Sequence, residues 1–144
     1  MPESQNYRNH TRWFPLVHFA IFPLLAVNLV WATVCVVLEF EWFRVQYLVL
    51  SIAVVLLSFA ARLQALRAQD RLIRLEERLR YKAVLTPELA AKASEFRVGQ
   101  IVALRFASDA ELSGLVDDIA AGKLVSQKEI KMAIKNWRAD HFRV

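Results

Sequence analysis

The stretch from Phe14 to Leu38, FPLVHFAIFPLLAVNLVWATVCVVL, decides the architecture because it holds 25 consecutive residues without a formal charge. About 20 apolar residues suffice for a helix to cross a hydrocarbon layer roughly 30 Å thick. A cleavable secretory signal is the rival interpretation, but its apolar region has only about 7–15 residues and ends at a small-residue cleavage site. The run therefore predicts a transmembrane helix.

A second apolar run, VQYLVLSIAVVLLSFAA, follows from Val45 to Ala61. Trp42, Phe43 and Tyr47 supply interfacial aromatic residues at one end, and Arg62 can extend toward the other interface. This run is also predicted to span, so the spans cover about 14–38 and 43–62.

The connector between the two runs, Glu39–Arg44, has only six residues, which predicts an antiparallel transmembrane hairpin over 13–61. Basic residues are concentrated outside it: Arg8 and Arg12 precede the first run, and seven Lys and Arg residues follow the second between positions 62 and 82. By the positive-inside rule both termini are cytoplasmic, including the segment 1–12. The expected location is therefore a membrane, with the lipid bilayer as one partner.

Several polar residues lie within the spans, and His18 is the one that invites a functional interpretation. Intramembrane polar groups often mark function, so His18 is a weak candidate for a haem or pigment ligand or a proton carrier. The favoured interpretation is structural, with Asn28 and the hydroxyls of Thr33, Ser51 and Ser58 bonding across helices. No cofactor is assigned. Pro23 should disturb the first helix, because proline lacks a backbone N–H.

The segment 62–84 contains neither Gly nor Pro and should continue the second helix into the cytoplasm, about 30 Å beyond the membrane. An apolar seam recurs in it at spacings of four and three residues, the period of a packed helical interface. Its members are Ala61, Ala65, Ala68, Leu72, Leu75 and Leu79. The seam should be covered either by the following domain folded back or by another copy of the chain.

A basic stripe runs beside that seam and gives this juxtamembrane segment a net charge of +4. Its members are Arg62, Arg67, Arg71, Arg74 and Arg78. The stripe fits anionic lipid head groups or an acidic partner surface. A solvated helix face that also acts as a topology signal explains it equally well.

The segment 85–144 is predicted to be a small helical cytoplasmic domain, so the chain as a whole is all-α. Helix start signals are Thr86-Pro87-Glu88 and the two capping-box patterns that begin at Ser108 and Ser126, while Gly122 should end a helix. They place four helices near 87–96, 99–107, 109–121 and 127–138. The expected core is Leu89, Phe96, Ile101, Leu104, Leu112, Leu115, Val116, Ile119, Ile130, Ile134 and Trp137.

The last predicted helix has an apolar side and a basic side. The basic side would present Lys128, Lys131, Lys135 and Arg138, and a tail with Arg143 follows. A basic stripe beside Trp137 could suggest nucleic acid. The domain from Ala83 onward has a net charge of only +1, however, which argues against that partner.

The residue types that catalysis and metal binding need do not occur together in the sequence. The three histidines, at positions 10, 18 and 141, form no pair at helical spacing, and the single cysteine, Cys35, lies inside the first apolar run. The three glycines are isolated, so no phosphate-binding loop is indicated. We therefore expect no enzyme and no metal site.

Several stretches distributed over nearly the whole chain resemble a family of small bacterial membrane proteins of unknown function. They are Asn9-His10-Thr11-Arg12, the arginine-rich run from Ala61 to Arg80, Ala103-Leu104-Arg105-Phe106-Ala107-Ser108-Asp109, and Lys135-Asn136-Trp137-Arg138 with Asp140 and Arg143-Val144. The resemblance implies two spans and a cytoplasmic helical domain in the bacterial inner membrane. It implies no activity, cofactor or catalytic residue.

Abundant interaction surface without recognisable chemistry favours a non-catalytic accessory or scaffold subunit. It would pack on a larger inner-membrane complex, such as an energy-converting one, and dock on its cytoplasmic side. Expected interaction residues are Arg62, Arg67, Arg71, Leu72, Arg74, Leu75, Arg78, Leu79, Lys128, Lys131, Lys135, Arg138 and Arg143. The alternatives are a homo-oligomer with a juxtamembrane coiled coil and a transport or sensing role, and a small cofactor- or pigment-binding subunit that uses His18.

Overall fold

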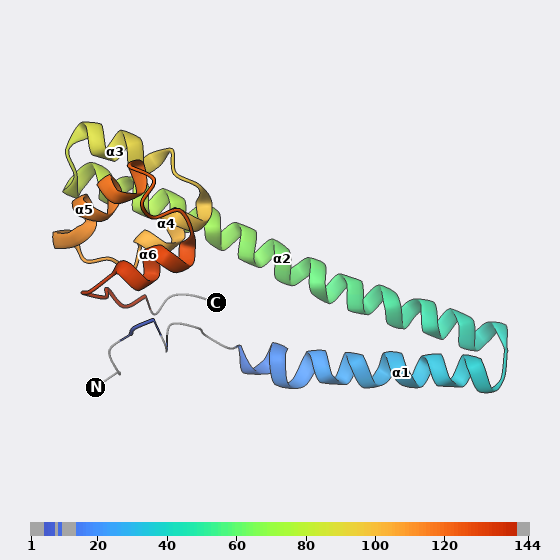
Figure 1. The fold of residues 1–144 in the computed structure, drawn as a ribbon. Helices are drawn as coiled ribbons and strands as arrows, with labels where there is room; N and C mark the ends of the chain where they lie inside the picture. The colour runs from blue at the N-terminus through green and yellow to red at the C-terminus, as the bar shows by residue number, and fades with distance from the viewer. Residues whose placement is uncertain (1–4, 8, 10–13, 141–144) are drawn as a thin grey trace. The chain divides into compact units, whose positions relative to one another are not determined.

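The computed structural model describes residues 5–7, 9 and 14–140, and the regular elements among them are all helical (Figure 1). The expected all-α class is confirmed. Within the described part, extended backbone pairs at a single antiparallel bridge between Ala107 and Trp137. Contacts divide the chain into two units, one comprising residues 13–66 and the other residues 1–12 and 67–144.

The first unit begins with a π-helical segment, Leu16–Ile21, which leads directly into α1, Phe22–Leu38. Pro23 stands at the beginning of α1 and cannot donate a backbone hydrogen bond to the turn before it. The π-helical hydrogen-bond pattern accommodates the missing donor locally, since Phe22 N–H bonds the carbonyl of Val17, five residues earlier. Such wider turns are a recognised way to absorb an interruption in the α-helical ladder.

Two side-chain contacts join α1 to the first half of α2, which extends over Trp42–Val84. The rings of Phe22 and Phe59 stack with centroids 5.2 Å apart, and the Asn28 amide donates a hydrogen bond to the Tyr47 hydroxyl. The earlier residue in α1 contacts the later residue in α2, so the two helices run in opposite directions. They lie side by side (Figure 1).

The hydroxyl groups in this unit correct one expectation. Thr33, Ser51 and Ser58 each donate to the carbonyl four residues earlier in their own helix, at 2.8–2.9 Å, rather than across helices. Asn28 does bond across, as expected. A hydroxyl can satisfy itself in this way because its own helix always offers a carbonyl one turn back.

The connector is shorter than expected, because α2 already begins at Trp42. Arg44 lies in its first turn and forms ion pairs with Glu39 and Glu41. Its guanidinium also donates to the Cys35 carbonyl at 3.2 Å. The same carbonyl accepts the backbone N–H of Glu39, so Arg44 is a second donor to it and ties the first turn of α2 to the last turn of α1.

Two helical stretches are long and apolar enough to cross a membrane by length and composition: Leu16–Leu38 and the helix Trp42–Val84. Only 6% of the most apolar window of each is buried. The core helix of a soluble protein would bury most of such a window. The large side chains here, including Leu24, Trp31 and Leu57, are instead more than 60% exposed.

Helix α2 continues without a break from its apolar first half to Val84, as the absence of Gly and Pro predicts. Four shorter helices follow it: α3 (Pro87–Ser94), α4 (Val98–Leu104), α5 (Asp109–Ala120) and α6 (Gln127–Ala133). In the second unit they gather around the C-terminal end of α2 (Figure 1).

Local capping explains where most of these helices start. The Thr86 hydroxyl accepts from Leu89 N–H, and Ser126 forms the expected capping box with Glu129. Helix α4 begins differently from expectation: the Gln100 side chain accepts the backbone N–H of Arg97. The expected capping box at Ser108 is absent, and its hydroxyl instead donates to the Glu111 carboxylate at 3.3 Å.

One apolar core holds the second unit together. Its largest fully buried side chains are Tyr81, Phe106, Ile101, Leu104, Leu112, Ile130 and Val116. Eight of the eleven residues expected in the core are buried, and Leu89, Phe96 and Trp137 are half-buried against it. The expected core omitted Tyr81, in the juxtamembrane segment 62–84, and Phe106, at the end of the predicted helix 99–107.

The last helix is shorter than predicted, and the expected range 127–138 is wrong. Helix α6 ends at Ala133, and Ile134 is extended. The Glu111 carboxylate of α5 accepts the backbone N–H groups of Lys135 at 3.2 Å and Asn136 at 2.8 Å. A side chain from another helix thereby binds two N–H groups that a longer helix would have used internally.

Candidate functional site

The apolar seam on α2 does not face the core of the second unit. The expectation that the following domain folds back and covers the seam is therefore wrong. Leu72, Leu75 and Leu79 are 56%, 57% and 61% exposed. The buried face of the same helix carries Ile73 and Tyr81, together with Glu77. The small helices therefore pack on the far side of α2 from the seam, and the seam remains open.

The arginines beside the seam divide into two groups. Arg67, Arg71 and Arg78 are exposed, whereas Arg62 and Arg74 are half-buried. Arg78 donates to the Ser94 carbonyl at the end of α3, at 3.2 Å. The stripe is therefore not uniformly solvated.

The basic face expected on the last helix does not exist as predicted. Lys131 is only 8% exposed, and its ammonium lies 5.5 Å from the centroid of the Phe106 ring, a cation–π geometry. Lys135 and Arg138 lie beyond the end of α6, so they cannot share a helical face with Lys128. Arg143 lies outside the described residues.

The C-terminal segment instead crosses the unit as extended chain. Ser108 N–H bonds the Asn136 carbonyl at 3.1 Å, and Arg138 N–H bonds the Phe106 carbonyl at 2.8 Å. The rings of Phe106 and Trp137 lie 5.1 Å apart. These contacts carry Arg138 and Asp140 to the surface of α2.

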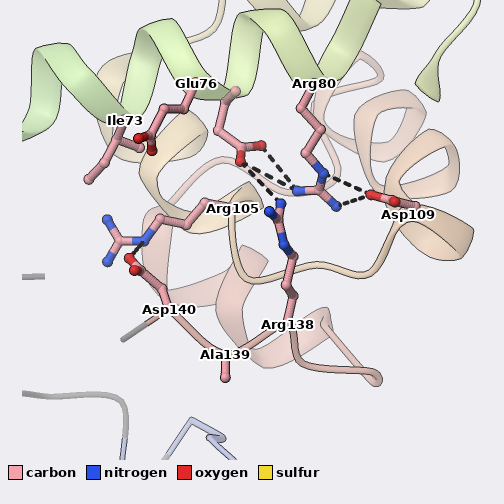
Figure 2. Close-up of a pocket in the computed structure, with 9 residues that line it drawn as sticks. Ile73, Glu76, Arg80, Arg105, Asp109, Arg138, Ala139 and Asp140 are labelled. Atoms are coloured by element: carbon pink, nitrogen blue, oxygen red, sulfur yellow. Dashed lines mark hydrogen bonds and ion pairs between the residues drawn. The ribbon is translucent and has the colours of Figure 1, made fainter. Parts of the chain in front are cut away.

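Charged side chains from α2, the α4–α5 junction and this segment line one pocket of the second unit, with a volume of about 530 Å³ (Figure 2). The lining residues are Ile73, Glu76, Glu77, Arg80, Arg105, Asp109, Arg138, Ala139 and Asp140. Four of them are acidic and three are basic, so the pocket has no large excess of either charge.

Arg80 is the centre of this cluster (Figure 2). Its guanidinium lies 3.2 Å from a Glu77 oxygen and 2.6 Å from Asp109, and it donates to the Ala107 carbonyl at 2.7 Å. The side chains of Arg80 and Glu77 are only 10% and 6% exposed. One guanidinium thus links α2 to the start of α5.

A second ion pair holds the C-terminal segment. Arg105 is 6% exposed and lies 3.1 Å from Asp140, while its guanidinium carbon is 4.4 Å from the Phe106 ring centroid. The backbone N–H of Asp140 also donates to the Gln5 side chain at 2.8 Å. The cluster therefore joins distant segments of the chain.

Burial raises the pKa of Glu77 above its usual value, and the guanidiniums of Arg80, Arg138 and Arg105 oppose that shift. Burial is likewise the main cause of a raised pKa at Tyr81. The Tyr81 hydroxyl is buried with no hydrogen-bond partner among residues 5–7, 9 and 14–140. These perturbed groups lie against a structural ion-pair network, which perturbs pKa values as active sites do.

This charged cluster was missed by sequence reasoning, although one signal for it is present. Ile73, Glu77 and Tyr81 recur every four residues and so share one face of α2, which marks Glu77 as a buried carboxylate once Tyr81 is known to be core. Nothing in local sequence pairs Arg80 with Asp109 or Arg105 with Asp140, since 29 and 35 residues separate them.

The histidine considered as a ligand, His18, has ordinary helical contacts. Its Nδ1 lies 2.9 Å from the Phe14 carbonyl, and its ring meets the edge of Phe22 with centroids 6.0 Å apart. Among the described residues, no group of three or more His, Cys, Asp or Glu side chains could hold a metal ion. His10 and His141 lie outside the described residues.

Comparison with known proteins places the whole chain in one family. No curated protein matches this sequence. No solved structure matches it either. The model of the Family of unknown function (DUF6526) matches residues 1–144, and the chain therefore belongs to that family.

Proposed function

We propose that this chain is a non-catalytic integral-membrane accessory subunit that joins a larger assembly in a bacterial inner membrane. In this proposal α1 and the first half of α2 form a two-span transmembrane hairpin. The rest of α2 continues into the cytoplasm as the basic juxtamembrane helix 62–84, and α3–α6 form a small four-helix cytoplasmic domain over 85–144. Both termini are cytoplasmic.

The observation that carries the proposal is the apolar ridge on α2, which we define as Ala68, Leu72, Leu75 and Leu79. All four residues are exposed, although Ile73, Glu77 and Tyr81 on the other face of the same helix are buried. Contiguous exposed apolar surface of this kind marks interaction sites in soluble domains. The ridge therefore supplies a surface for protein association outside the spans.

The charged cluster supports a structural rather than a catalytic role for the pocket. Arg80 binds both Glu77 and Asp109, and Arg105 binds Asp140. The first set of contacts fixes α5 against α2, and the second fixes the C-terminal segment against the end of α4. The charged side chains of the pocket therefore stabilise the fold of the domain that carries the ridge.

Site-specific photocrosslinking tests this role. A photoreactive phenylalanine at position 75, in the full-length chain in native membranes, should form an adduct with protein. The matched control is position 67, which is exposed on the same helix but lies off the ridge. Adducts at neither position, or equal adducts at both, would refute the ridge as the interaction surface.

Topology is tested separately with reporters. Tags at the two ends should both report the cytoplasm, and a cysteine at Glu41, in the connector, should react with an impermeant reagent from outside in a chain whose own Cys35 is replaced by Ser. Ends in opposite compartments would overturn the hairpin.

A further inference from the structure

The ridge on α2 has the spacing of a coiled-coil seam. Ala68, Leu72, Leu75 and Leu79 are separated by four, three and four residues, which places them at alternating core positions of a heptad. They remain exposed in the folded second unit, on the far side of α2 from Ile73, Glu77 and Tyr81. Within the described residues, nothing buries the ridge.

The two flanks of the ridge carry opposite charge. At 3.6 residues per turn, Arg71 and Arg78 lie along one side of the ridge, and Gln69 and Glu76 lie along the other. In a coiled coil these flanking positions contact the neighbouring helix and set its identity and direction. Arg71, Arg78 and Glu76 are exposed, so they can meet a second helix, and Arg78 also donates to the Ser94 carbonyl.

We propose that the occupant of the ridge is the ridge of a second copy of this chain, in a parallel two-stranded coiled coil. In the parallel arrangement, each residue on the arginine flank of one helix faces the residue five positions later on the glutamate flank of the other helix. Arg71 of each copy then faces Glu76 of the other, which forms two symmetric ion pairs. An antiparallel arrangement would instead bring the arginine flanks together, where like charges repel.

This inference rests on the proposed function, because the membrane supplies two of its conditions. Two copies inserted in the same direction hold their α2 helices parallel. Confinement to one bilayer also raises the concentration of each ridge near the other, as any linkage between binding sites does. A seam of only two heptads, weak as an isolated peptide, can associate under these conditions.

Cysteine crosslinking tests the geometry. In the full-length chain with Cys35 replaced by Ser, the single variants Leu72→Cys and Leu79→Cys should each give a disulfide-linked species of twice 16.6 kDa on mild oxidation of native membranes. Arg67→Cys, the matched control off the ridge, should stay monomeric. An antiparallel pair would place Leu72 opposite Leu79, with about 10 Å along the axis between identical positions, which exceeds disulfide reach.

Charge exchange tests the pairing. Arg71→Glu and Glu76→Arg should each reduce the crosslinked fraction of Leu72→Cys at least several-fold, because each leaves like charges opposed. The double variant R71E/E76R should restore it. Exposed residues carry these changes, so the fold of the monomer is preserved.

The outcomes separate this inference from the proposed function. Position-75 photoadducts with a different protein, together with no self-crosslink, would overturn the dimer and leave the accessory role intact. Self-crosslinking of Leu72→Cys or Leu79→Cys that is no stronger than that of Arg67→Cys would also overturn the dimer, as would a double variant that fails to recover. No protein adduct at position 75 would overturn both.

Discussion

Replacing Arg80 by Met should uncouple the second unit, since this one guanidinium satisfies three acceptors at once. Met keeps most of the chain length and removes the charge, so Glu77 is left buried with Arg138, at 3.9 Å, as its remaining ion-pair partner. The Ala107 carbonyl, on a fully buried residue, also loses its 2.7 Å donor.

The magnitude follows from burial. Asp109 is 64% exposed, so its share of the pairing is at most about 1 kcal/mol. Glu77 is 6% exposed, and removal of one member of a buried ion pair costs about 3–5 kcal/mol because the other charge loses its nearest partner. The Arg80–Glu77 pair therefore dominates the expected loss. At 1.4 kcal/mol per factor of ten, this loss is roughly two to more than three orders of magnitude in opening equilibrium.

Hydrogen exchange of the full-length protein in detergent measures this loss directly. Amides of α4 and α5 should lose protection by that factor in R80M, while the exposed control Arg67→Met should change the opening free energy by less than about 0.5 kcal/mol. The variant E77Q/R80M should be more protected than the sum of the single losses predicts. A loss below about 1 kcal/mol in R80M, or strict additivity, would refute the buried-pair account.

Three further predictions use the same exchange measurement. Gly122→Ala should destabilise α5 by about 1 kcal/mol, because residue 122 has φ +73°. Gly114→Ala should instead stabilise α5 by about 0.5–1 kcal/mol, since a methyl group there meets no atom within 4 Å. Equal effects of the two substitutions would contradict this. The pKa of Glu77 is raised from 4.5 in the fold, so the protonated carboxyl contributes stability that is present below pH 4.5 and is lost as pH rises through the raised pKa. This decrease in stability should be missing in Glu77→Gln. Identical pH profiles of the two proteins would disprove it. Tyr81→Phe should be neutral or stabilising, because it deletes a buried hydroxyl without a partner among the described residues, and a loss above about 1 kcal/mol would show that the hydroxyl is satisfied.

Hydrophobic periodicity and local signals were sufficient for much of this fold. The apolar runs, the uninterrupted helix through 62–84 and the caps at Thr86 and Ser126 depend on residues within a few positions of one another. The same is true of Gly122, where Lys123 N–H bonds the Asp118 carbonyl around the left-handed residue. Local physics of this kind can be read from a single sequence.

Tertiary contacts overrode local propensity in the C-terminal segment. Residues 134–138 carry a helical pattern, yet Glu111 from α5 binds the N–H groups of Lys135 and Asn136, and the chain continues as a bridge to Ala107. Lys131 was expected at the surface and is buried beside Phe106. Neither outcome has a signal within a few residues of the position concerned.

Except at the C-terminal segment, the sequence by itself determined which segments are helical and how apolar they are, since both properties come from neighbours along the chain. It offered two apolar or partly apolar faces on α2, and only the tertiary structure decided that Ile73, Glu77 and Tyr81 turn inward while Leu72, Leu75 and Leu79 stay exposed. The physical reason is that Arg80 can satisfy Glu77, Asp109 and the Ala107 carbonyl together only when that charged face is the buried one. Two of these three partners, Ala107 and Asp109, lie 27 and 29 residues from Arg80, so no local pattern could reveal which face is buried.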